Sequence, residues 1–246
     1  MLVVGFPAAA FGTNCFVLAP AAGEACLVVD PGIGVAGRLD AVLREHRLQP
    51  VAVLLTHGHL DHTFSVAPVC NARGISAYVH PADEAMLADP MLGISPEAVA
   101  MVEASGLVYT APDDVVPLDD TTAMTLAGLT ITVDHAPGHT PGSVLFRLPD
   151  VPDGSRDRAG SGTILSGDVL FAGSIGRTDL PGGDTAAMMR SLAAKILPLD
   201  DAILVLPGHG PATTIGRERA TNPYLHEAQH ALGRVAGGST ARDGSR

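Results

Sequence analysis

The chain has 246 residues, of which 46% are hydrophobic and 17% are charged, so it has ample apolar material for a core and is not a disordered chain. The 26 Asp and Glu residues outnumber the 15 Lys and Arg residues, which gives a formal charge of −11. Such an acidic chain is poorly suited to binding nucleic acid or anionic membranes through its general field. We therefore expect neither nucleic acid nor a membrane among its partners.

The cysteines and the N-terminal segment indicate a cytoplasmic protein. Cys15, Cys26 and Cys70 form no Cys-x-x-Cys pair, and their odd number argues against a disulfide framework. Residues 1–23 carry no charged side chain, but they lack the basic start of a signal peptide. Glycine and proline also interrupt the apolar run that a membrane helix requires. The sequence leaves the oligomeric state open.

The apolar pattern predicts strands and helices that alternate along the chain, with hairpins between some strands, so the sheets should be mixed. One domain is expected over residues 1–232, followed by a flexible tail over 233–246. An exposed loop is expected at 150–162, and residues 89–117 show no clear pattern. Strands are predicted at 14–18, 25–29, 52–55, 75–79, 122–126, 129–135, 144–148, 164–166 and 202–206, and helices at 35–47, 63–72, 81–88, 184–196 and 217–220.

The strongest functional signal is the cluster Thr56-His57-Gly58-His59-Leu60-Asp61-His62, directly after the predicted strand at 52–55. An extended turn would point His57 and His59 the same way, and a following helix would turn Asp61 and His62 toward a neighbouring point. Neutral imidazole and carboxylate suit zinc, and also iron or manganese. A solvated polar turn is the alternative, but histidine clusters of this density are rare outside metal sites.

Three further candidate ligands follow other predicted strands. They are His139 in Pro-Gly-His-Thr, Asp168 in Ser-Gly-Asp and His209 in Gly-His-Gly, and each lies beside a glycine that lets the backbone approach closely. Strand ends at one edge of a sheet are where α/β folds gather their sites. Either histidine alone could be an ordinary structural residue, but the four loops together indicate a metal centre.

These motifs, preceded by Asp30-Pro31-Gly32, resemble those of metallo-β-lactamase-fold hydrolases and appear in the same order over roughly residues 1–225. Within that family the chain looks most similar to short bacterial type II glyoxalase-like (hydroxyacylglutathione hydrolase-like) proteins. The resemblance implies an αβ/βα four-layer sandwich, in which two mixed β-sheets lie face to face with helices on the outer faces. It also implies a hydrolase that cleaves a small acyl-thiol ester.

Carried over residue by residue, the resemblance implies two divalent metal ions, expected to be zinc, with iron or manganese as alternatives. A hydroxide bridging such a pair would be the nucleophile, and Asp61 could orient it or accept its proton. The first metal would be held by His57, His59 and His139, the second by Asp61, His62 and His209, and Asp168 would bridge the two.

Three other residues are expected near the centre. Asp30 and Thr56 would support the ligand loop by hydrogen bonds, although Asp30 also fits a plain turn carboxylate before Pro-Gly. Arg177 could pair with a substrate carboxylate, or instead with Asp179 or Asp184 to shape its loop.

Other chemistries stay open. The Gly-Arg-Thr-Asp run at 176–179 also occurs in persulfide dioxygenases, which resemble this chain in their ligands but use a single iron. Little chain follows His209, so we expect no counterpart of the helical domain with which full-length glyoxalase II grips glutathione, and glutathione itself is not predicted as the thiol. Lactonase or lactamase activity is less favoured, because the lactamases with a similar histidine cluster lack the bridging carboxylate that Asp168 would supply. A non-catalytic metal-binding scaffold is a further alternative.

Overall fold

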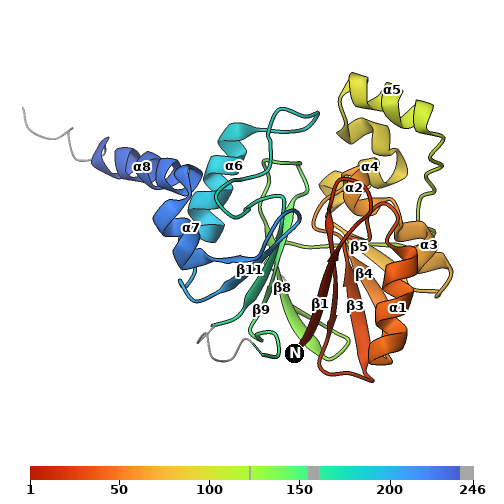
Figure 1. Cartoon of the computed structure of the whole chain (residues 1–246). Helices are drawn as coiled ribbons and strands as arrows, with labels where there is room; N and C mark the ends of the chain where they lie inside the picture. The colour runs from red at the N-terminus through yellow and green to blue at the C-terminus, as the bar shows by residue number, and fades with distance from the viewer. Residues whose placement is uncertain (122, 155–160, 239–246) are drawn as a thin grey trace, which may run out of the picture.

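The computed structural model describes residues 1–121, 123–154 and 161–238, and its strands form two six-stranded sheets (Figure 1). In the first sheet the strand order is β1-β2-β3-β4-β5-β6. β1, β2 and β3 pair antiparallel, whereas β3 to β6 run parallel, so the sheet is mixed as predicted. Its strands are β1 (Leu2–Pro7), β2 (Asn14–Ala19), β3 (Ala25–Val29), β4 (Gln49–Leu54), β5 (Ser76–Val79) and β6 (Val115–Pro117).

The second sheet has the order β12-β11-β10-β9-β8-β7. Only the pair β10 and β11 is parallel among its described strands, and the other neighbours are antiparallel. Its strands are β7 (Ala123–Leu126), β8 (Leu129–His135), β9 (Val144–Leu148), β10 (Thr163–Gly167), β11 (Leu204–Pro207) and β12 (Thr213–Thr214).

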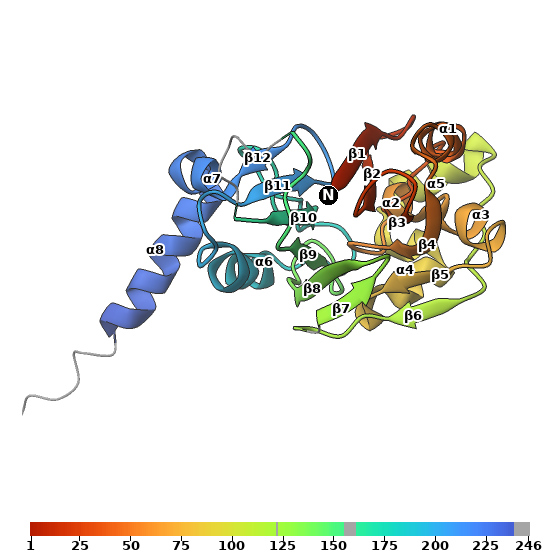
Figure 2. The ribbon, with the colours of Figure 1, turned by 90° about the horizontal axis from the view of Figure 1, so that it is seen from below.

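Helices lie on the outer faces of both sheets (Figure 2). The first sheet is covered by α1 (Ala36–His46) and α3 (Val66–Asn71). The second is covered by α6 (Thr185–Ser191), the π-helical turn η4 (Leu192–Ile196), α7 (Ile215–Thr221) and α8 (Pro223–Gly238). The remaining elements are α2 (Leu60–Thr63), η1 (Pro81–Asp83), α4 (Glu84–Ala88), η2 (Pro90–Gly93) and α5 (Pro96–Ser105).

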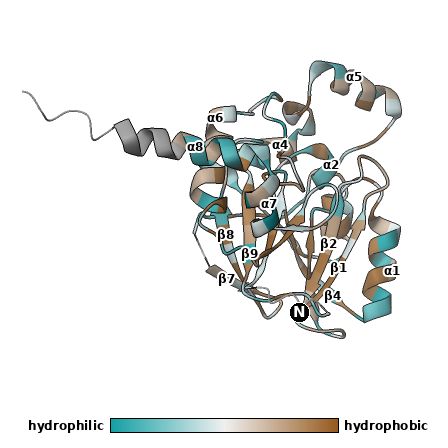
Figure 3. Cartoon of the chain, turned by 60° about the vertical axis from the view of Figure 1, so that its left-hand side comes forward, coloured by the Kyte–Doolittle hydropathy of each residue, from teal (hydrophilic) through white to brown (hydrophobic). Residues whose placement is uncertain are grey.

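Three apolar clusters fill the spaces between the four layers. In β3, Cys26 and Val28 face the helices of the first sheet, whereas Leu27 and Val29 face the second sheet. The same alternation in β9 sends Leu145 to the helices of the second sheet and Phe146 to the space between the sheets. Because both faces of such strands are buried, the strands read as continuous apolar runs, which Figure 3 shows as brown ribbon. The predicted four-layer sandwich is therefore confirmed.

Several elements differ from the sequence prediction. β1 was not predicted because Gly5 and Pro7 interrupt its apolar run, yet an edge strand tolerates a proline at its end. The helix predicted at 63–72 is two helices, α2 and α3. The helix is interrupted at Ser65, whose backbone amide donates to the carbonyl of Pro31 and whose hydroxyl donates to the carbonyl of Gly32. The unpatterned stretch 89–117 contains η2, α5 and β6.

At the C-terminus, α8 continues to Gly238, past position 233 where the sequence predicts the tail to begin. Leu232 and Val235 continue the helical spacing of Leu225 and Ala228 in the sequence, a pattern that the glycines obscure. The rest of the predicted tail, 239–246, and the loop residues 155–160 lie outside the described residues, so the domain limit at 232 stays a prediction. Within the described ranges, no helix is both long and apolar enough to cross a membrane.

Candidate metal centre

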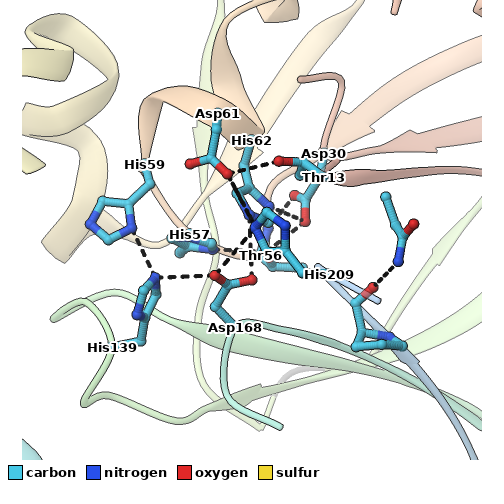
Figure 4. A network of polar contacts seen from close by, with 12 residues as sticks. Thr13, Asp30, Thr56, His57, His59, Asp61, His62, His139, Asp168 and His209 are labelled. Carbon is cyan, nitrogen blue, oxygen red and sulfur yellow. Dashed lines mark hydrogen bonds and ion pairs between the residues drawn. The ribbon is translucent and has the colours of Figure 1, made fainter. Parts of the chain in front are cut away.

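The predicted ligands gather at one end of the sandwich, where loops from both sheets meet (Figure 4). The first sheet supplies the cluster that follows β4, and the second sheet supplies the loops that follow β8, β10 and β11. The structure brings all seven predicted ligands together there: His57 and His59 after β4, Asp61 and His62 within α2, His139 after β8, Asp168 after β10 and His209 after β11.

The first group consists of His57, His59 and His139, all of them buried. One ring nitrogen from each lies within 4.8 Å of the others. Nδ1 of His59 and Nε2 of His139 are 2.8 Å apart, and the ring centroid of His57 is 4.9 Å from that of His59 and 4.7 Å from that of His139. Three imidazoles that converge in this way form one face of a metal-binding site.

The second group consists of Asp61, His62 and His209, and its ligand atoms also lie within 4.8 Å of one another. Oδ2 of Asp61 is 3.2 Å from Nε2 of His209 and 3.5 Å from Nε2 of His62. The ring of His62 also lies close to the first group, with centroid distances of 4.1 Å to His57 and 5.3 Å to His209. The two candidate sites are therefore adjacent.

Asp168 lies between the two groups. Its Oδ2 is 3.5 Å from Nε2 of His139 in the first group and 3.6 Å from Nε2 of His209 in the second. Its Oδ1 is 3.4 Å from Nε2 of His62. A carboxylate that faces both sets of nitrogens occupies the position of a bridging ligand, and its bridging role stays a prediction that this geometry supports.

Hydrogen bonds on the far side of the rings fix the tautomers of His57 and His62. The Thr56 hydroxyl donates to Oδ2 of Asp30 at 2.6 Å, so it accepts from Nδ1 of His57 at 3.1 Å. Nδ1 of His62 donates to the same Asp30 oxygen at 3.0 Å. Nε2 is therefore the nitrogen of each ring that faces the centre, and Asp30 and Thr56 lie where they hydrogen-bond the far side of these two candidate ligands.

His139 is oriented by the backbone of Arg177. Its Nδ1 donates to the carbonyl oxygen of Arg177 at 2.7 Å, which leaves Nε2 free to face the centre. The Arg177 side chain turns away to Asp179, with bonds of 2.6 and 2.8 Å from its guanidinium to the two carboxylate oxygens. Of the two roles considered for this side chain, the structure shows the ion pair with Asp179.

The donor set fits divalent metal ions. Among the described residues, three buried polar atoms have no hydrogen-bond partner: Nε2 of His57, Nε2 of His59 and Oδ1 of Asp168. Nε2 of His57 and Oδ1 of Asp168 face the centre, whereas Nε2 of His59 lies on the far side of its ring from Nδ1, the atom that faces His139. Buried polar groups almost always have partners, so the two unpaired atoms that face the centre indicate a ligand there. All the donors are nitrogen or oxygen, which suits zinc, iron or manganese.

The charge state of the first group matches a metal site. Burial and the neighbouring imidazoles hold the pKa of His57 well below its usual value. Burial, followed by the effect of His139, lowers the pKa of His59 to about 3. These imidazoles are therefore neutral at physiological pH, and neutral imidazole is the form that binds a metal.

The second group favours buried positive charge. Burial opposes a charged imidazole at His62, but the carboxylates of Asp61 and Asp168 outweigh burial and hold its pKa well above the usual value. Burial also opposes a charged carboxylate at Asp61, but His62 and hydrogen bonds from His209 and Thr13 hold its pKa below the usual range. A divalent cation supplies the positive charge that these carboxylates favour.

Two residues near the centre were not singled out from the sequence. The Thr13 hydroxyl donates to Oδ2 of Asp61 at 2.7 Å, and Thr13 also pairs with His209 through an isolated β-bridge. Asp83 is fully buried and accepts from the amide of Gly58 at 2.8 Å, the amide of Gly142 at 2.6 Å and the hydroxyl of Thr140 at 2.6 Å. Its position shortly after β5, at the edge where the ligand loops gather, is the one feature that could have indicated Asp83.

A family comparison covers most of the chain. The family model described as the metallo-beta-lactamase superfamily matches residues 8–209, a range that includes all seven candidate ligands. An uncharacterised protein of Mycobacterium tuberculosis is 46% identical, over 92% of this chain and 98% of its own length. The hydroxyacylglutathione hydrolase GloC of Haemophilus influenzae is 33% identical, over 89% of this chain and 96% of its own length.

Solved structures share both the fold and part of the sequence. The crystal structure of the BLEG-1 B3 metallo-beta-lactamase superposes with a TM-score of 0.73 at 35% identity, covering 91% of this chain and 99% of that one. The crystal structure of TTHA1623 in a di-iron-bound form has a TM-score of 0.72 at 36% identity, covering 90% of this chain and 100% of that one.

Proposed function

The chain belongs to the metallo-β-lactamase superfamily, and we propose that it is a dinuclear-metal hydrolase that cleaves small acyl-thiol esters. The observation that carries the proposal is the pair of three-residue ligand groups with Asp168 between them. Two groups that share one carboxylate suit two cations at close range better than they suit one. The thioester substrate is supported by GloC, which is named for hydrolysis of such an ester.

The residues of the chain would divide the work of hydrolysis. Bound divalent cations supply an acidified water and a Lewis acid for the substrate carbonyl. Asp61 would accept the proton of the attacking water, because its Oδ2 faces His62 and His209 and is held by the Thr13 hydroxyl. Asp30 and the backbone of Arg177 would keep the imidazoles in the ligand tautomer throughout the reaction.

The proposed metal is zinc, with iron and manganese as alternatives, because the donor atoms are nitrogen and oxygen only. Iron gains support from the di-iron-bound relative. The proposed compartment is the cytoplasm, since the three cysteines are free and buried. The proposed partner is the small-molecule substrate.

One assay with two readouts tests the proposal. Purified protein is given S-D-lactoyl thioesters, and in a parallel reaction a thiol persulfide with recording of oxygen uptake. Thioester cleavage without oxygen uptake, with two metal ions per chain by elemental analysis, is the expected result. Oxygen uptake with sulfite release, together with a single iron per chain, would instead identify a persulfide dioxygenase, the alternative favoured by the Gly-Arg-Thr-Asp run at 176–179. A cephalosporin included as a third substrate measures lactam hydrolysis.

A further inference from the structure

We propose that the cavity beside the metal centre binds an apolar acyl chain, so that the preferred substrates are thioesters of straight-chain alkanoyl groups without charge. This inference rests on the thioester activity proposed above and specifies its substrate class. It follows from the walls of the cavity, from the helix α5 that forms one of them, and from the ion pair that Arg177, the one cationic side chain among the described lining residues, makes with Asp179.

The cavity connects the metal centre with an apolar wall. Its volume is about 390 Å³, and His59, His139 and Asp168 line the end at the metal centre. Away from the ligands, most of the lining is hydrophobic: Phe11, Leu60, Ile94, Ala98, Val102, Phe171 and Leu180. Pockets that hold apolar ligands have such walls, with a few polar groups at the reacting end.

The helix α5 presents an apolar face to this cavity and to no protein core. Ser95, Ala98 and Val102 line the cavity, and their spacing places them on one side of the helix. None of the residues in α5 is buried, and none of them belongs to the three core clusters. Figure 1 shows α5 at the same end of the sandwich as α2, which carries two of the candidate ligands. The apolar face of α5 therefore lacks a packing partner that an acyl chain would supply.

The opposite wall comes from loops of both sheets. Phe11, between β1 and β2, has a side chain that is 70% exposed although it lines the cavity. Phe171 and Leu180 lie in the loop between β10 and α6 and are half-buried. Burying exposed apolar surface of this kind against a ligand is favourable in proportion to the area removed from water.

The lining offers no free cation for an anionic substrate group. Arg177 is the one Arg or Lys among the described residues that line the cavity. Both of its bonds to Asp179 are short, and the pair is geometrically matched as guanidinium to carboxylate. A carboxylate on the acyl chain would have to compete with Asp179 for the Arg177 guanidinium. Otherwise it would lie against the apolar wall, and burying a charge there is unfavourable.

A chain-length series tests the inference. Values of kcat/KM are measured for S-acyl N-acetylcysteamine thioesters with acetyl, butanoyl, hexanoyl and octanoyl groups, and for the succinyl ester as the charged counterpart of butanoyl. We expect kcat/KM to rise about twofold to fourfold for each added methylene. The succinyl ester should be at least about tenfold poorer than the butanoyl ester. A flat or falling series, or equal rates for butanoyl and succinyl, would overturn the inference.

Three variants of α5, two on the cavity face and one control, locate the acyl chain. Val102→Ser, on the cavity face, should lower kcat/KM for octanoyl about tenfold and leave acetyl within about twofold. Met101→Ser is the matched control, because Met101 is on the same helix but is 72% exposed and does not line the cavity. Ala98→Phe should fill the cavity and abolish the advantage of octanoyl over acetyl. If Val102→Ser changed all substrates equally, or no more than Met101→Ser, the chain would not lie against α5.

A binding measurement separates this inference from the proposed function. Straight-chain 2-alkanones carry a carbonyl and an apolar chain but cannot be hydrolysed, so calorimetry reports their affinity whether or not the protein cleaves thioesters. Without any thioester turnover, the proposed function fails, and affinity that rises with alkanone length would still support the apolar site. Alkanone affinity that is independent of length, or is unchanged in Val102→Ser, would reject the site itself.

Discussion

The carboxylate of Asp83 accepts a hydrogen bond from the backbone amide of Gly58 at 2.8 Å, between the two ligands His57 and His59. The same carboxylate accepts from the hydroxyl of Thr140, the neighbour of His139, at 2.6 Å. One buried side chain therefore joins the loop of the first sheet to the loop of the second sheet at the group formed by these three histidines. It sets the spacing of the loops without contacting the centre.

Replacement of Asp83 should weaken metal binding at this first group. Because Asp83→Ala removes the connection between the loops, we expect one of two metals to bind about 10- to 100-fold more weakly. Asp83→Asn should be milder, since an amide oxygen in place of Oδ2 can still accept from both Gly58 and Thr140. Titration with a competing chelator measures each affinity, and circular dichroism checks the fold. Two metals held with unchanged affinity in Asp83→Ala would contradict the positioning role.

Asp168→Ala should remove the paired site and leave the fold intact. The residue lies on a loop at the edge of the sheet and is not a member of any of the three apolar clusters, so unfolding is not expected. Metal content should fall below two per chain, and thioester hydrolysis should fall by at least about 100-fold, the scale of losing one key electrostatic group. A variant that keeps two metals and near-normal turnover would refute the bridging role.

Replacing Asp30 should reduce metal binding and activity less than replacing Asp168, because Asp30 acts on the candidate ligands through hydrogen bonds. Its backbone has a φ of 50°, a conformation that Asp and Asn tolerate better than Ala. We therefore expect Asp30→Ala to lower metal affinity or activity about 10- to 100-fold, and to reduce thermal stability more than Asp30→Asn. Parallel measurement of melting temperature and metal affinity distinguishes the backbone effect from the loss of the bond to His62. Equal behaviour of the two variants in both measurements would count against this explanation.

Gly208→Ala should disturb the centre although it adds one methyl group. A Cβ atom at this position would overlap Oδ1 of Asp168 and lie 2.7 Å from Cε1 of His62. We expect loss of metal and of activity with little change in the fold. Gly37→Ala is the matched control, since Gly37 is on the exposed side of helix α1 and its Cβ would meet nothing within 4 Å, and it should raise stability by about 0.5–1 kcal/mol. Full metal content in Gly208→Ala would show that the site can relax around a side chain.

The three cysteines should be unreactive in the folded protein. Burial raises the pKa of Cys26 to about 12 and that of Cys70 to about 12, and it raises the pKa of Cys15 as well. The thiol pKa is near 9 in the unfolded chain, so unfolded thiols ionise before folded ones as the pH rises. The contribution of the buried thiols to the free energy of unfolding is therefore complete below about pH 9 and declines as the pH rises toward 12. Labelling with a chromogenic disulfide should be slow in buffer and rapid in guanidinium chloride. Rapid labelling of any thiol in buffer would mean that its burial is incomplete.

The ligands could be predicted from the sequence because each belongs to a local pattern. His57 to His62 stand together after an apolar run, and His139 and His209 each stand beside a glycine after another run. Two supporting residues, Thr13 and Asp83, had no such pattern, unlike Asp30 and Thr56. Thr13 and Asp83 gain their roles only where the two sheets meet, and no local spacing encodes which loops will face each other. Helix α5 lacked a readable pattern for a related reason, since Ala98 and Val102 line a cavity and none of its residues is buried in a core.

Each of the two ligand groups draws from both sheets: His57 and His59 meet His139 from across the sandwich, and Asp61 and His62 meet His209. Neither group exists until the sheets have docked, so an unfolded or half-folded chain offers no complete site. Bound cations would therefore link the two halves, and by mass action they would stabilise the native state by about 2.7 kcal/mol when free metal is 100 times the dissociation constant. If the proposed centre binds metal, the supply of divalent cations would set the stability of the folded chain as well as its rate of turnover.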